Sequence, residues 1–167
     1  MEESMTGKDA GLMKPGLDGG YFIPDPAGDI RALFDIADKD IRSYSPLTLA
    51  FLGDSVYEMI IRSLVSQKYD LSAGKLNREK VRYVNAAAQA MILDSVFDEL
   101  TEDEQKISKS GRNAKSRTSA KNQQVTDYRK ATGFEALCGY LYLSGRVDRL
   151  YEIVQKGVKL LDEKNGK

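Results

Sequence analysis

Hydrophobic residues recur every three to four positions along most of this chain, which is the spacing of an amphipathic α-helix. No stretch shows the alternation of apolar and polar residues that marks a half-buried β-strand, and no internal repeat stands out. The pattern therefore predicts an all-α protein. A length of 167 residues allows one domain with a sizeable core and leaves no room for a second large module.

Capping residues divide the first part of this pattern into helices. Asp29 is expected to cap a helix that ends near Ser43, and Ser45 followed by Pro46 predicts a helix that runs to about Val65. The core-facing stripe expected on the first of these helices comprises Ile30, Leu33, Phe34, Ala37 and Ile41.

Three further helix starts follow from the same kind of signal, and the chain ends in an amphipathic helix. The starts are expected at Asp70 or Ser72, at a capping box formed by Thr101 and Glu104, and at Thr126 or Asp127. The apolar side of the last helix comprises Val147, Leu150, Val154, Val158 and Leu161.

The two ends of the chain differ in composition. Residues 1–27 are rich in Gly, Pro, Asp and Met and lack an apolar period, so we expect a flexible extension before a domain spanning residues 28–167. No apolar run reaches the roughly 20 residues that span a bilayer, and the N-terminus lacks the order of a secretory signal. The single cysteine, Cys138, cannot form an internal disulfide. The expected protein has no membrane association and is cytoplasmic.

The complete absence of histidine limits the chemistry available to this chain. It excludes catalytic triads, cysteine–histidine pairs and zinc sites that use histidine. Cys138 stands in an apolar context that raises the pKa of a thiol, so we expect it to be unreactive core packing. Any catalysis must therefore use carboxylates, Lys, Tyr or metal-bound water.

One carboxylate, that of Asp54, stands inside the otherwise apolar run at residues 47–58. Burying an unpaired carboxylate costs several kcal/mol, so such a residue needs a hydrogen-bond partner, a counter-charge or a metal ion. A second apolar run, at residues 134–143, contains only Glu135 as an acid. If the two helices pack together, the two acids can meet and form a magnesium site. The alternative is that each acid braces its own helix independently.

The charge of the chain is zero overall but unevenly distributed. Residues 1–46 hold nine acids and five bases, which leaves the remainder mildly basic. Between Lys106 and Lys130 the only acid is Asp127, and Ser, Gly and Asn separate the bases. This composition predicts a cationic loop that either contacts phosphates or serves as a solvated connection.

The motifs around both acids resemble those of a known family. Residues 51–56 read Phe-Leu-Gly-Asp-Ser-Val, which is similar to the signature of the ribonuclease III catalytic domain, and residues 134–143 resemble the second acidic motif of that domain. Further segments resemble Mini-ribonuclease III, a short bacterial form; these are residues 57–58, 82–86, 111–115 and 128–137. The resemblance covers roughly residues 30–163.

This resemblance implies a ribonuclease III-like helical catalytic domain without a separate domain for binding double-stranded RNA. It further implies a homodimeric, Mg²⁺-dependent endoribonuclease that cleaves double-stranded RNA. The characteristic substrate is the precursor of the large-subunit ribosomal RNA.

The resemblance also assigns roles to individual residues. Asp54 and Glu135 match the two central catalytic and metal-binding acids, whereas two further acids common in the family correspond to Ala50 and Thr132. A site with fewer protein ligands and more water is therefore expected. Glu58 lies one helical turn after Asp54, where it either orients a metal-bound water or pairs with a base, and pairing is favoured. Phe51 matches an aromatic residue at the dimer interface, although an ordinary core position is the alternative.

Proteins hold A-form RNA mainly through phosphates and 2′-hydroxyls, a task that suits basic side chains. The candidate RNA-binding residues are Lys75, Arg78, Arg82, Lys109, Arg112, Lys115 and Arg117. Two other classes of protein remain open at this stage. One is a catalytically silent domain that only binds structured RNA, and the other is a helical interaction protein with no role in RNA metabolism.

Overall fold

The structure is a computed structural model and describes residues 14–15, 21–22, 24–114 and 123–166. Its α-helices are α1 (Pro26–Leu33), α2 (Pro46–Lys68), α3 (Ala73–Val84), α4 (Ala86–Val96), α5 (Glu102–Asn113), α6 (Gln123–Leu143) and α7 (Val147–Lys164). Short 3₁₀ helices lie at η1 (Ile41–Ser43) and η2 (Phe97–Glu99), and the two-residue strands β1 (Lys14–Pro15) and β2 (Tyr21–Phe22) pair antiparallel. The prediction of an all-α protein is confirmed, with this small strand pair as its one departure in the described part of the chain.

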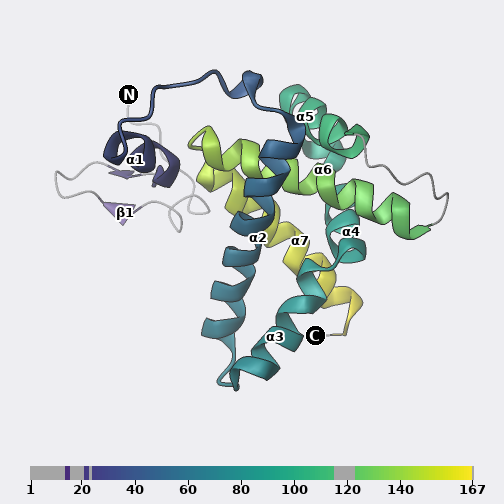
Figure 1. The fold of residues 1–167 in the computed structure, drawn as a ribbon. Helices are drawn as coiled ribbons and strands as arrows, with labels where there is room; N and C mark the ends of the chain where they lie inside the picture. Colours follow the sequence, from purple (N-terminus) through teal and green to yellow (C-terminus); the bar gives the residue numbers. More distant parts are fainter. Residues whose placement is uncertain (1–13, 16–20, 23, 115–122, 167) are drawn as a thin grey trace, which may run out of the picture.

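Helix α6 is the centre of the molecule, and Figure 1 shows α2 crossing it steeply. Helices α4, α5 and α7 also pack on α6, and α1 contacts it to a smaller extent. Its residues Phe134, Leu137 and Leu141 are fully buried. Tyr57 of α2 meets Phe134 edge to face, with 5.0 Å between the ring centroids. Within the described ranges, no helix combines the length and the apolar composition that crossing a bilayer requires.

Local capping signals correctly placed several of these helices. Ser45 caps α2, because its hydroxyl accepts a hydrogen bond from the Thr48 amide at 3.1 Å, and Pro46 occupies the first turn. The helix continues to Lys68, three residues beyond the predicted end. The capping box of Thr101 and Glu104 forms in both directions at the start of α5.

The predicted first helix was wrong in position and in the face that it buries. Helix α1 starts at Pro26, where Asp25 accepts a hydrogen bond from the Gly28 amide at 3.0 Å. It ends at Leu33, and Asp35 adopts a positive φ of 50° that does not continue a helix. Leu33, like most of the predicted core-facing stripe, is exposed. The pair Asp25–Pro26 is the stronger helix start, since it combines a capping carboxylate with a proline in the first turn.

The cationic loop predicted between Lys106 and Lys130 was too long at both ends, and residues 115–122 at its centre lie outside the described residues. Helix α5 continues to Asn113 and α6 is already present at Gln123, ahead of the start predicted at Thr126 or Asp127. Ser108 and Gly111, which suggested a loop, are buried small residues that let α5 approach α6. Of the predicted RNA-binding residues, Lys115 and Arg117 lie outside the described residues.

Candidate active site

Two glycines bring α2 and α6 into direct backbone contact. A Cβ atom added at Gly53 would lie 1.7 Å from the Glu135 carbonyl oxygen, and one added at Gly139 would lie 2.0 Å from the Leu49 carbonyl oxygen. No side chain larger than hydrogen fits at either position, so the helices cross at the closest distance that their backbones allow. Asp54 follows Gly53 directly, and the crossing therefore places it next to Glu135.

The two acids share one electrostatic environment. Asp54 is exposed and Glu135 is partly buried. Burial, followed by the negative charge of Asp54, raises the pKa of Glu135 to about 7, while a hydrogen bond from Gln89 acts in the opposite direction. The structure thus brings together the two carboxylates that the sequence placed far apart. A divalent cation between them would neutralise both charges.

Few side chains around these acids could bind a metal ion. Ala50 is buried and carries no oxygen in its side chain, and the Thr132 hydroxyl donates a hydrogen bond to the Tyr128 carbonyl at 3.0 Å. Among the described residues, no cluster of three or more Asp, Glu, His or Cys side chains is arranged to hold a metal ion. The two carboxylates that are present, Asp54 and Glu135, fit a cation such as Mg²⁺, which keeps several waters and uses one or two carboxylates.

Gln89 of α4 acts on Glu135 by lowering its pKa, and the sequence reasoning missed this residue. Its side chain is only 3% exposed, and its Nε2 donates a hydrogen bond to the Val84 carbonyl at 3.0 Å. The residue stands in a run of alanines that suggested only close helix packing. A lone polar side chain in such a run was the signal that would have identified it.

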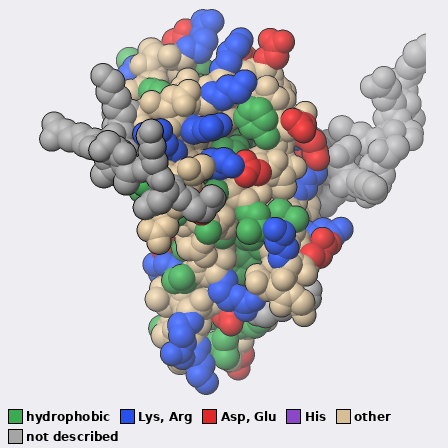
Figure 2. Space-filling view, turned by 90° about the vertical axis from the view of Figure 1, so that its right-hand side faces the viewer, with side chains coloured by type: hydrophobic (Ala, Val, Ile, Leu, Met, Phe, Trp, Pro, Cys, Tyr) green, Lys and Arg blue, Asp and Glu red, His purple; other side chains and the backbone are tan. Residues whose placement is uncertain are grey.

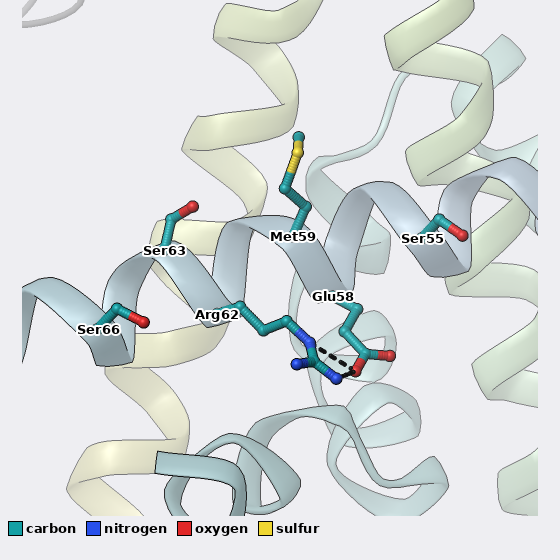
Figure 3. A pocket seen from close by; sticks show the side chains of 6 residues that line it. All are labelled: Ser55, Glu58, Met59, Arg62, Ser63 and Ser66. Atoms are coloured by element: carbon teal, nitrogen blue, oxygen red, sulfur yellow. Dashed lines mark hydrogen bonds and ion pairs between the residues drawn. The ribbon is translucent and has the colours of Figure 1, made fainter. Parts of the chain in front are cut away.

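Glu58 is paired with two cations. Its Oε1 accepts hydrogen bonds from Lys80 of α3 at 2.6 Å and from Arg62 at 2.7 Å, and Figure 3 shows the contact with Arg62 along α2. Hydrogen bonds from Lys80 and then Arg62 hold the pKa of Glu58 below its usual value. This geometry matches the pairing alternative for Glu58. A direct role at the metal stays a prediction.

The candidate RNA-binding residues in the described chain lie on two helices. Lys75 and Arg78 are exposed on α3, where Arg82 pairs with Glu79 at 3.2 Å. Lys109 and Arg112 are exposed on α5 and border a pocket of about 220 Å³ between α4, α5 and α6. Figure 2 shows Lys and Arg side chains spread from the upper to the lower end of one face of the molecule.

Phe51 does not belong to the core, because its side chain is 81% exposed on α2. Leu47 and Met59 on the same helix are also exposed. Next to them lies an open pocket of about 600 Å³ on the surface of α2, lined by Ser55, Glu58, Met59, Arg62, Ser63 and Ser66 (Figure 3). Leu47, Phe51 and Met59 follow one another at four- and eight-residue spacing along α2, and exposed apolar patches of this kind often mark surfaces that another protein covers.

Comparisons with known proteins agree with this architecture. The model of the ribonuclease III domain matches residues 47–146, which contain both acids and the helix crossing between them. The fold and the matched domain thus define an endoribonuclease of the ribonuclease III class.

Proteins of similar sequence identify the family within the ribonuclease III class. The Mini-ribonuclease 3 of Clostridium tetani is 42% identical over 130 residues, covering 77% of this chain and 86% of that protein. The Mini-ribonuclease 3 of Enterococcus faecalis is 41% identical over 131 residues, and the match covers 77% of this chain and 99% of that protein. A solved structure of a protein from Fusobacterium nucleatum aligns with a TM-score of 0.65 and 34% identity, over 73% of this chain and 98% of that one. The chain belongs to the Mini-ribonuclease 3 family, and the resemblance stated from its motifs is confirmed.

Proposed function

We propose that this protein is an Mg²⁺-dependent endoribonuclease that cleaves double-stranded RNA as a homodimer, with the precursor of ribosomal RNA as its substrate. The observation that carries the proposal is the close placement of Asp54 and Glu135 at the glycine crossing, where the charge of one raises the pKa of the other. Two acids in mutual repulsion favour a bound divalent cation. The name of the relatives supports the reaction class.

In this mechanism Asp54 of α2 and Glu135 of α6 would hold the cation. When bound, Mg²⁺ supplies a polarised water and charge stabilisation at the phosphodiester. Glu135 must lose its proton to serve as a ligand, because only the carboxylate form binds a hard cation. Asp54 is exposed and therefore accessible to an RNA backbone that approaches from solvent.

Basic side chains on α3 and α5 are proposed to hold the duplex. Lys75, Arg78, Lys109 and Arg112 are exposed and suit contacts with phosphates, which fix position without reading sequence. Arg82 and the two residues outside the described chain, Lys115 and Arg117, complete the proposed set. A cytoplasmic location fits a ribosomal RNA substrate and the single Cys138, which is buried.

The dimer is proposed to form through the exposed face of α2 around Phe51. One domain supplies one pair of acids, so cleavage of both strands of a duplex requires two protomers. The exposed aromatic and the neighbouring pocket give this face the apolar anchor that a stable interface needs.

The test uses the near-isosteric variants Asp54→Asn and Glu135→Gln. Each is expected to abolish cleavage of a long RNA duplex in Mg²⁺ while duplex binding is retained and the melting temperature is not lowered, since only the metal-binding charge is removed. Cleavage is measured by sizing the products on a denaturing gel. If Asp54→Asn cuts at near the wild-type rate, the catalytic assignment is wrong and a silent RNA-binding domain takes its place.

A further inference from the structure

Gln89 presents an unsatisfied oxygen in the interior of the protein, on a side chain that acts on Glu135. Its Nε2 donates to the Val84 carbonyl, and the side chain is close enough to Glu135 to lower the pKa of that carboxyl. Its Oε1 is buried and accepts no hydrogen bond from any described residue. A buried amide oxygen without a partner costs about 1–3 kcal/mol, and such an atom in a native fold points to a missing water or ion.

The neighbours of Gln89 determine which end of the amide stays free. The Val84 carbonyl is at the last residue of α3, and it accepts hydrogen bonds only. The Glu135 carboxylate is an acceptor as well. Rotating the amide by half a turn would set Oε1 against acceptors and leave Nε2 without them. The nitrogen therefore anchors the side chain, and the oxygen remains for another group.

We propose that Gln89 is a positioning residue of the metal site, and that its Oε1 accepts a hydrogen bond from a water bound to the cation that Asp54 and Glu135 hold. This inference rests on the proposed function. Because Ala50 and Thr132 supply no carboxylate, the cation keeps more of its waters, and those waters need acceptors to be held in place. Gln89 provides such an acceptor from a third helix, α4.

Two roles of Gln89 use different atoms, which makes them separable. A structural role depends on Nε2, which joins α4 to the end of α3 through the Val84 carbonyl. The proposed role depends on Oε1. The variant Gln89→Glu keeps an oxygen acceptor and loses the N–H donor, whereas Gln89→Met keeps the length of the side chain and loses both.

The experiment measures Mn²⁺ binding to the RNA-free full-length protein by the electron paramagnetic resonance signal of free Mn²⁺, below the melting temperature of each variant. Gln89→Met is expected to weaken binding about tenfold or more, and Gln89→Glu to bind within about threefold of wild type or more tightly. The matched control is Gln105→Met on α5, because the Nε2 of Gln105 also donates to a backbone carbonyl, that of Phe97, at 3.0 Å. This control should bind Mn²⁺ like wild type.

Two results would overturn the inference. One is wild-type Mn²⁺ affinity in Gln89→Met, and the other is an equal loss in Gln89→Met and Gln89→Glu, which would assign the effect to the Nε2 anchor. Asp54→Asn in the same titration separates this failure from a failure of the proposed function. If Asp54→Asn loses Mn²⁺ and Gln89→Met does not, only the role of Gln89 is wrong. If Asp54→Asn binds normally, the metal site itself is wrong.

Discussion

At the scale of single residues, carboxylates one helical turn apart on α2 have opposite surroundings. Glu58 is neutralised by Lys80 and Arg62, whereas Asp54 adds its negative charge to the surroundings of Glu135. The difference arises from the neighbouring helices, because α3 contributes a cation to Glu58 and α6 contributes a second acid to Asp54. The two sites therefore lead to different predictions for Glu135 and for Glu58.

Glu135 is expected to make the metal-free protein less stable as the pH rises. Its pKa is about 7 in the folded protein against an ordinary value of 4.5, so between these two pH values folding takes up a proton. The free energy of unfolding therefore falls as the pH rises from about 4.5 to about 7. Glu135→Gln should therefore stabilise the metal-free protein by about 1–2 kcal/mol at a pH above about 7, after allowance for partial exposure. Below a pH of about 4 it should have little effect.

Chemical denaturation at several pH values, with a metal chelator present, measures this difference. Titration of the Glu135 carboxyl by nuclear magnetic resonance provides the direct check. In Asp54→Asn the pKa of Glu135 should fall, because the repelling charge is gone. An unchanged pKa in that variant would contradict the close placement of the two acids.

Glu58→Gln is expected to cost stability and leave metal binding intact. The variant leaves the ammonium group of Lys80, a buried residue, without its anionic partner. Removing one member of such a pair costs about 1–3 kcal/mol when one side is partly solvated. Thermal melts measure the loss of stability, and Mn²⁺ titration measures metal binding. A stable variant that no longer binds Mn²⁺ would instead make Glu58 a ligand.

At the scale of elements, the crossing of α2 and α6 depends on two glycines. Gly139→Ala is expected to destabilise the protein by about 3 kcal/mol or more, because the new methyl group would overlap the backbone of α2. The matched control is Gly74→Ala on α3, where a Cβ meets nothing within 4 Å. The free energy of unfolding of this control variant should rise by up to about 1 kcal/mol, since alanine favours the helix more than glycine does. Equal melting temperatures for the two variants would contradict the close crossing.

Helix α5 is expected to supply RNA affinity without sequence preference. The double variant Lys109→Ala and Arg112→Ala should lower the slope of log affinity against log salt by about 2, because two phosphate contacts are lost. Binding should weaken equally for duplexes of unrelated sequence. Filter binding of two such duplexes across a range of salt measures both effects. The control is Lys159→Ala on α7, whose slope should match wild type.

At the scale of the whole molecule, the exposed face of α2 is expected to hold two protomers together. Phe51→Ala should weaken dimerisation by roughly thirtyfold or more, because a central aromatic anchor is worth about 2 kcal/mol or more. Phe34→Ala is the matched control, since Phe34 is 72% exposed but lies just after α1. Sedimentation across a concentration series measures both. A monomeric, fully active wild-type protein would contradict the proposed dimer.

Local sequence determined where several helices begin. Ser45, Pro46 and the capping box of Thr101 and Glu104 act within one helical turn, so their effect can be recognised without knowledge of distant residues. The motifs around Asp54 and Glu135 likewise identified the family. These features depend on neighbours in sequence or on the order of the motifs along the chain, and both are visible in the sequence itself.

Tertiary structure decided what each of these residues faces. Small residues such as Ser108 suggested a loop in the sequence, but in the structure a second helix packs on α5 and buries them. Glu58 pairs with Lys80 only because α3 packs on α2. The unpartnered oxygen of Gln89 exists because α3, α4 and α6 converge around it. Burial and charge pairing are sums over residues far apart in the chain, so periodicity and capping alone do not determine them.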